Sequence, residues 1–265
     1  MVRGPRKHLK RLYAPTSWML KKSEGRYAPR ISSGPHKKDE SIPLRILLSK
    51  KLKIASTSKE VEYILRNRMI KVNNNVRTDK DFPVGIFDTL TVGDNKDFLR
   101  LLYNTDGKFV LKRISKEDSM TKIVKVRETA IRKGNVPYVY TMDGCCYRFC
   151  DQNIKKNFTV KIDFETNKIV KFLKLVVGSI VFTINGKNRG SVGKVIGIEE
   201  NEYSENIIKI QDFNGREFST IESSTICIGN KVDNYEIQLL DTKGIKKSIL
   251  EMSNDTYGPM VVQQN

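Results

Sequence analysis

From residue 95 onwards, the apolar side chains come in short runs that alternate with polar ones, which is typical of half-buried β-strands. In "NFTVKIDF", Phe158, Val160 and Ile162 alternate with polar residues, and residues 165–168 make a turn before the next apolar run. Similar runs occur in "KFVLKRI", "TKIVKVRE" and "VPYVYTMDG". Residues 95–175 are therefore predicted to form a β-rich domain, although this pattern does not indicate what the domain does.

Five further short strands follow from about residue 178, in "SIVFTI", "GKVIGIEE", "IIKIQDF", "EFSTI" and "STICIG". Their close spacing predicts a small closed or partly closed barrel over residues 176–229. The loop "NGKNRGSVG" places Lys187, Asn188 and Arg189 at its tip. Glycines on both sides allow the backbone to approach a phosphate chain closely. A solvated hairpin tip is the alternative reading of this loop.

Two helices and a hairpin are predicted between residues 42 and 94. In "IPLRILLSKKLKIA", the leucines share one helical face, and Thr57 with Glu60 fits the capping box of a second helix. "MIKVNNNVRTD" predicts a strand, a turn of asparagines and a strand, and "FPVGIFDTLTV" extends the sheet. The helices carry basic side chains that the fold does not require, and a solvated helix face is the alternative explanation for them.

The first 41 residues have a different character. "MVRGPRKHLKRLYAPTSWMLKKSEGRYAPRISSGPHKK" contains no apolar stripe at helical spacing and no strand alternation, and prolines and glycines punctuate it at turn-like intervals. Such a segment cannot bury enough surface to fold alone. We therefore expect an extended basic segment that is ordered by a partner.

The distribution of charge indicates the kind of partner. Of the formal net charge of +18, residues 1–53 carry +12, residues 54–197 carry +12 and residues 198–265 carry −6. Such a field attracts polyanions, and nucleic acid is the commonest polyanion that a soluble protein meets. An anionic membrane fits less well, because the sequence shows neither a basic amphipathic helix nor an apolar run long enough to span a bilayer. No RNA contact is predicted for the mildly acidic tail.

The residue pattern does not fit a catalytic or metal site. Cys145, Cys146 and Cys150 lie close together, but Cys227 has no neighbouring partner, and structural zinc uses two close pairs of ligands. Two histidines leave little for acid–base catalysis. "NGKNRGSVGKV" lacks the first glycine and the final Ser or Thr of a phosphate-binding loop. No enzyme activity, cofactor or metal is predicted, and the thiols are expected to be reduced in an intracellular protein.

Several motifs occur in a fixed order: "RGPRKHLKR", "YAPRISSGPHK", "VRTD", "PVGIFD", "LYNTDGKF" and the loop "NGKNRGSVG", which matches the KOW motif. Together they cover about residues 1–250 and resemble the family of small-subunit ribosomal protein four of the eukaryotic and archaeal type. The resemblance implies a multidomain α+β architecture. Its parts are a basic N-terminal extension ordered by RNA (1–41), an S-four-type RNA-binding module (42–94), a central β-rich domain (95–175), an SH3-like KOW barrel (176–229) and a tail (230–265).

This resemblance implies a structural constituent of the small ribosomal subunit that binds folded rRNA through phosphate and shape contacts, beside neighbouring ribosomal proteins. It implies a cytoplasmic location, nucleolar transit during assembly in a eukaryotic cell, no membrane and no homo-oligomer. Trp18 is expected to pack rather than to stack on a base. The predicted RNA-binding residues are Arg3, Arg6, Lys7, His8, Lys10, Arg11, Lys21, Lys22, Arg26, Tyr27, Arg30, His36, Lys37, Lys38, Arg45, Lys50, Lys53, Arg66, Arg68, Arg77, Lys187, Asn188, Arg189 and Lys194.

Other functions are weighed against this one. A KOW-containing transcription elongation factor needs protein surface more than the phosphate neutralisation that the first segment offers. An RNA-modifying enzyme with an S-four module needs a catalytic Asp in a sizeable α/β domain, and the central region has few long helical stretches. A chromatin-binding basic protein would prefer duplex DNA to folded RNA.

Overall fold

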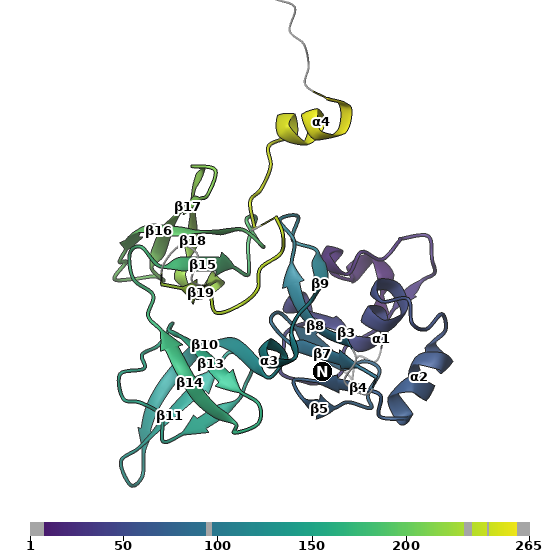
Figure 1. Ribbon diagram of the computed structural model, residues 1–265, viewed down its shortest axis with the longest axis horizontal. Coiled ribbons are helices and arrows are strands. Elements are labelled where there is room, and N and C mark those ends of the chain that lie inside the picture. The colour runs from purple at the N-terminus through teal and green to yellow at the C-terminus, as the bar shows by residue number, and fades with distance from the viewer. Residues whose placement is uncertain (1–7, 94–96, 231–234, 243, 259–265) are drawn as a thin grey trace, which may run out of the picture.

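The computed structural model describes residues 8–93, 97–230, 235–242 and 244–258, and Figure 1 shows several small sheets and few helices. The architecture is mixed α+β and mostly β, in agreement with the sequence. None of the described helices has the length and apolar character that crossing a membrane requires. The helical segments are α1 (Leu44–Ile46), α2 (Ser58–Arg66), α3 (Lys116–Ser119), α4 (Ile249–Tyr257), the π-helical η4 (Leu47–Lys51) and the 3-10 turns η1 (Arg11–Tyr13), η2 (Thr16–Trp18), η3 (Lys38–Glu40) and η5 (Glu222–Ser224).

The first large sheet is antiparallel and has the strand order β5-β4-β7-β8-β9. The β4–β5 turn places Asn73 and Asn74 at positive φ, as predicted, and α2 begins with the predicted capping box of Thr57 and Glu60. The strands are β4 (Ile70–Val72), β5 (Asn75–Val76), β7 (Thr89–Val92), β8 (Asp97–Tyr103) and β9 (Phe109–Arg113).

This sheet continues across the division between residues 94 and 95, where the sequence separates two domains. Because β8 pairs with β7 along Thr89–Val92, that division lies between two neighbouring strands of one sheet. The sheet ends at Arg113, and α3 leads from it into the next sheet.

The first helix differs from the prediction. Only one turn of α-helix forms, and the π-helical turn η4 follows it. Leu44, Leu47 and Leu48 are nevertheless buried, as expected from their shared helical face.

The second large sheet is formed by the central region and has the order β12-β11-β10-β13-β14, with every pair antiparallel. Its core includes Val124, Val126, Val139, Val160 and Ile162. The β13–β14 hairpin is the one predicted from the alternation at residues 158–168. The strands are β10 (Thr121–Arg132), β11 (Val136–Thr141), β12 (Cys146–Arg148), β13 (Thr159–Asp163) and β14 (Lys168–Leu173).

The third large sheet contains the five short strands predicted after residue 178, in the antiparallel order β18-β17-β16-β15-β19. Val181, Val195, Ile208 and Ile210 form its core. The last strand therefore pairs with the first, which brings the two ends of this region together. The strands are β15 (Ile180–Thr183), β16 (Val192–Glu199), β17 (Ile207–Asp212), β18 (Glu217–Ile221) and β19 (Thr225–Gly229).

The described part of the N-terminal segment lies on the chain's own body, which corrects the expectation that only a partner could order it. The strands β1 (Leu9–Lys10) and β2 (Tyr27–Ala28) pair, and β3 (Ser41–Pro43) pairs with β6 (Pro83–Gly85) of the first module. Trp18 is 1% exposed, and its Nε1 donates to the Ser41 carbonyl oxygen at 2.7 Å. Packing of this indole is thus confirmed, and burial of this large aromatic side chain anchors the segment on the first module.

Part of the tail also covers the body. Ile237 is buried, and the Glu236 carboxylate pairs with Lys161 (3.1 Å) and with Lys171. The Lys112 ammonium, which belongs to the first sheet, donates to the Leu239 carbonyl oxygen. Residues 235–242 therefore link the first sheet to the central one. In contrast, α4 lies apart from the sheets in Figure 1, and none of its residues is buried.

Candidate RNA interface

The structure divides the predicted RNA-binding residues into exposed and internally engaged side chains. Arg3, Arg6 and Lys7 lie outside the described residues. Those that are partly buried are Arg11, His36, Arg45, Arg77, Asn188 and Arg189. Those that are exposed are His8, Lys10, Lys21, Lys22, Arg26, Tyr27, Arg30, Lys37, Lys38, Lys50, Lys53, Arg66, Arg68, Lys187 and Lys194.

The β1–β2 hairpin gathers an aromatic ring and several cations. Tyr27 is 50% exposed, the His8 ring lies 5.6 Å from its centroid, and the Arg26 guanidinium lies 5.7 Å from it. Lys10 is the direct cross-strand partner of Tyr27, so both side chains point to the same face. An exposed ring surrounded by cations can stack on a base while its neighbours pair with phosphates.

Arg11 organises the turn that follows. Its Nε donates to the Gly25 carbonyl oxygen at 3.0 Å, and its Nη1 donates to the Lys21 carbonyl oxygen at 3.2 Å. These bonds use two of the five N–H donors with which the guanidinium could bind phosphate. Arg11 therefore holds the turn that displays Lys21 and Lys22.

Two arginines of the first module are engaged in a similar way. Arg45 pairs with Asp81 at 2.8 Å, and the Arg77 guanidinium lies 4.4 Å from the centroid of the Phe82 ring. Both contacts order the loop before β6. Arg66 and Arg68, at the end of α2, are exposed instead. The module thus offers fewer cations to a partner than its sequence predicts.

The barrel loop is packed against the first sheet. The Arg189 guanidinium lies 4.9 Å from the centroid of the Tyr103 ring and donates to Asn185 Oδ1 at 3.2 Å. A Cβ on Gly190 would collide with the Asn104 carbonyl oxygen. The glycine does permit a close backbone approach, but to this chain's own backbone rather than to a phosphate. Lys187 stays exposed.

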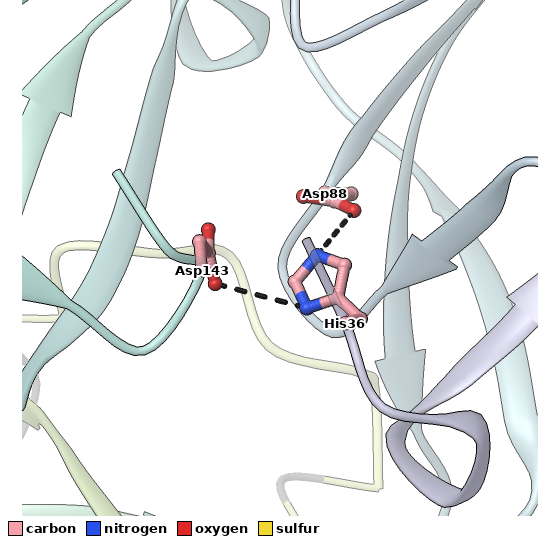
Figure 2. Close-up of side chains that lie close together, drawn as sticks. All are labelled: His36, Asp88 and Asp143. Atoms are coloured by element: carbon pink, nitrogen blue, oxygen red, sulfur yellow. Dashed lines mark hydrogen bonds and ion pairs between the residues drawn. The ribbon is translucent and has the colours of Figure 1, made fainter. Parts of the chain in front are cut away.

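His36 belongs to a buried ionic network that joins three parts of the chain (Figure 2). Its Nε2 lies 2.9 Å from Asp88 Oδ2, and its Nδ1 lies 3.7 Å from Asp143 Oδ1. The Lys122 ammonium of β10 pairs with both carboxylates. Because the His36 side chain is 7% exposed, it is unavailable to RNA, which corrects the sequence prediction.

The network keeps its charges despite burial. Burial alone would raise the pKa of Asp88, but Lys122 and His36 outweigh it, so the pKa of this carboxyl is lowered. Burial likewise opposes the charge on Lys122, but Asp143 and Asp88 raise the pKa of its ammonium. His36, Asp88 and Asp143 form a possible metal-ligand group among the described residues. Since the Lys122 ammonium already supplies the positive charge there, the group functions as an ion-pair junction.

A second buried lysine connects the central sheet with the barrel. Lys125 on β10 donates to the Thr225 carbonyl oxygen at 2.9 Å and to the Glu222 carbonyl oxygen. Burial lowers the pKa of Lys125 to about 8. The sequence analysis did not identify Lys122 and Lys125. The available signal was their position inside the apolar run "TKIVKV", because a lysine within such a run is expected to lie in a buried strand.

Comparison with known proteins identifies the family. The family model described as "Ribosomal family S4e" matches residues 95–169, and the RS4NT (NUC023) domain model matches residues 3–39. The chain is 42% identical over 251 residues to small ribosomal subunit protein eS4 of Candida albicans, covering 95% of this chain and 96% of that protein. It is 40% identical over 264 residues to the eS4 protein of Bombyx mori, covering 100% of both. The chain belongs to the ribosomal protein family S4e.

A solved member of family S4e has a related fold. The crystal structure of the 30S ribosomal protein S4e from Thermoplasma acidophilum matches with a TM-score of 0.63 and 28% identity. The match covers 76% of this chain and 100% of that chain. The S4e resemblance seen in the sequence motifs is therefore confirmed over nearly the whole chain.

Proposed function

We propose that this member of family S4e is a structural constituent of the small ribosomal subunit and that it binds folded rRNA. The observation that carries the proposal is the 40–42% identity, over nearly the full chain, to proteins named small ribosomal subunit protein eS4. The net charge of +18 and the exposed cations of the N-terminal segment support rRNA as the partner.

The interface that we propose has two kinds of residue. The first kind is exposed. In the N-terminal segment, Lys10, Lys21, Lys22, Arg26 and Arg30 neutralise phosphates. Further contacts come from the exposed residues His8, Tyr27, Lys37, Lys38, Lys50, Lys53, Arg66, Arg68, Lys187 and Lys194. The engaged arginines, such as Arg11 and Arg189, position the segments that carry these cations. Phosphate and shape contacts dominate over the reading of base edges, as is usual for structured RNA.

Each of the three large sheets corresponds to one region of the proposed interface. We propose an S-four-type module after residue 42, a central β-rich region and an SH3-like KOW barrel at residues 176–229, each contributing rRNA or protein contacts. Neighbouring ribosomal proteins are the other partners, and the chain is expected to act without self-association. Its location is the cytoplasmic ribosome, with nucleolar transit during assembly in a eukaryotic cell. No catalysed reaction is proposed, and the relatives support neither an elongation factor nor an RNA-modifying enzyme.

Crosslinking in the protein's own cells tests the proposal. We expect a tagged chain to sediment with small subunits and with whole ribosomes on sucrose gradients. After ultraviolet irradiation, its crosslinks should concentrate in a few segments of small-subunit rRNA. Crosslinks scattered over nascent transcripts, together with sedimentation beside polymerase, would contradict the proposal and favour the elongation-factor alternative.

A further inference from the structure

The central sheet encloses a cleft to which the proposed interface assigns no role. The cleft has a volume of about 870 Å³ and is lined by residues 145–151 and 166–172, together with Ile154. These ranges contain β12 and β14, which are the two edge strands of one sheet. The sheet therefore brings its two open edges to the same cleft.

An aromatic side chain stands at the rim of this cleft. Phe149 follows β12 directly, and its side chain is 77% exposed. Its φ is 56°, a left-handed conformation that is rare for a bulky residue, and its N–H donates to the Pro137 carbonyl oxygen at 3.0 Å. The hydrogen bond helps to hold this conformation, in which the residue lies exposed. Strained residues of this kind cluster at binding and catalytic sites.

The charge around Phe149 is positive. Arg148 and Lys168 line the cleft, are exposed, and have no carboxylate partner among the described residues. Lys171 also lines the cleft and pairs with Glu236 of the tail, which it shares with Lys161. Asp151 is the one acidic residue of the lining. An exposed ring and two cations without carboxylate partners in one cleft suit a ligand that combines a flat base with a phosphate.

The same edges are poorly suited to a peptide strand. β12 has only three residues, and in β14 the register with β13 skips Val170, which forms a bulge and is exposed. Short edge strands, bulges and edge lysines are the features by which proteins prevent the addition of another strand. A ligand that contacts side chains rather than backbone is therefore favoured.

We propose that this cleft binds an unpaired RNA nucleotide, with the base stacked on Phe149 and the phosphates near Arg148 and Lys168. The proposal rests on the proposed rRNA-binding function and adds a contact site in the central region. Because the base stacks on Phe149, part of the cleft's contribution to affinity persists when salt screens the phosphates.

Binding of a short single-stranded oligouridylate to the full chain tests this site. We expect Phe149→Ala to weaken binding by about 5- to 150-fold, since loss of one stacked base costs about 1–3 kcal/mol. Phe149→Trp should bind as tightly as the wild type, because tryptophan also stacks. The matched control is Tyr203→Ala, which removes a ring that is 99% exposed on the barrel, and it should leave the affinity unchanged. Ultraviolet crosslinking of the wild-type chain should give uridine adducts within residues 145–172.

The outcomes separate this inference from the proposed function. Adducts in residues 8–30 without adducts in 145–172, or an affinity unchanged by Phe149→Ala, would overturn the cleft assignment alone. If no RNA adduct forms anywhere, both proposals fall. In assembled small subunits, an amine-reactive crosslink from Lys168 to a neighbouring protein, with no uridine adduct on the cleft, would show a protein-docking site instead. The adduct mapping uses the wild-type chain, so it tests whether RNA binds in the cleft even if a variant folds poorly.

Discussion

Replacing the exposed cations of the N-terminal segment by glutamine should weaken rRNA binding without unfolding the protein. The five residues are Lys10, Lys21, Lys22, Arg26 and Arg30, and none of them pairs with a carboxylate among the described residues. Truncation would be a poorer test, because it would also remove the buried Trp18 and His36 anchors. The substitutions leave both anchors in place, so a loss of binding reports the charges.

The expected magnitude follows from counterion release. Each neutralised phosphate contributes about 0.7–0.9 to the slope of log affinity against log salt, so five lost contacts reduce the slope by about four units. Relative to binding at about 1 M salt, that corresponds to a loss of about 10⁴ in affinity at about 0.1 M. The effect should therefore be large at low salt and should vanish as salt rises.

The assay is binding of the full chain to a small-subunit rRNA transcript over a series of potassium chloride concentrations. The matched control removes five exposed cations elsewhere: Arg113, Lys116, Lys133, Lys155 and Lys156. It changes the net charge equally and should alter the slope much less. Equal slopes for the two variants would refute the reasoning, because affinity would then follow net charge instead of this surface. Urea unfolding should show similar stability for both variants.

Two further predictions concern the junctions between the sheets. Gly85→Ala should lower the free energy of unfolding by roughly 1–3 kcal/mol, because its Cβ would collide with the His36 ring. In a chain that also carries His36→Ala, this loss should be smaller. If urea unfolding showed that the losses of the two single variants simply add up in the double variant, the contact would be contradicted. Lys125 has a pKa of about 8 in the folded chain against an ordinary 10.5. The unfolded chain then binds more protons between these values, so the free energy of unfolding should rise with pH across that window, by at most roughly 3 kcal/mol. Lys125→Met should remove the rise, and an identical pH profile for the variant and the wild type would show that the burial of Lys125 is not its cause.

Local patterns predicted the elements well. The capping box of Thr57 and Glu60, the asparagine turn after β4 and the β13–β14 hairpin depend on residues close in sequence, so their geometry can be read from residue order. The five strands after residue 178 follow from the same alternation. The family motifs also occur in sequence order, which is why family S4e could be recognised before the fold was known.

The division between residues 94 and 95 illustrates where local reasoning is insufficient. The predicted domains 42–94 and 95–175 meet there, yet the strands on either side, β7 and β8, pair within one sheet. Composition reports how polar a connection is, but not whether the strands on either side bond to each other. That depends on the pairing of whole strands, which the sequence shows only indirectly.

The sequence by itself determined the charge of this protein, its β-rich character and the short-range motifs that place it in family S4e. Only the tertiary structure decided which cations are available to a partner. Arg11, His36 and Arg189 have the same residue types as their exposed neighbours, but each contacts groups that are 10 to 150 residues distant in sequence. Burying an unpaired charge is costly, so each of these side chains acquires internal partners where the fold covers it. The availability of a cation to RNA is therefore a property of packing, not of residue type.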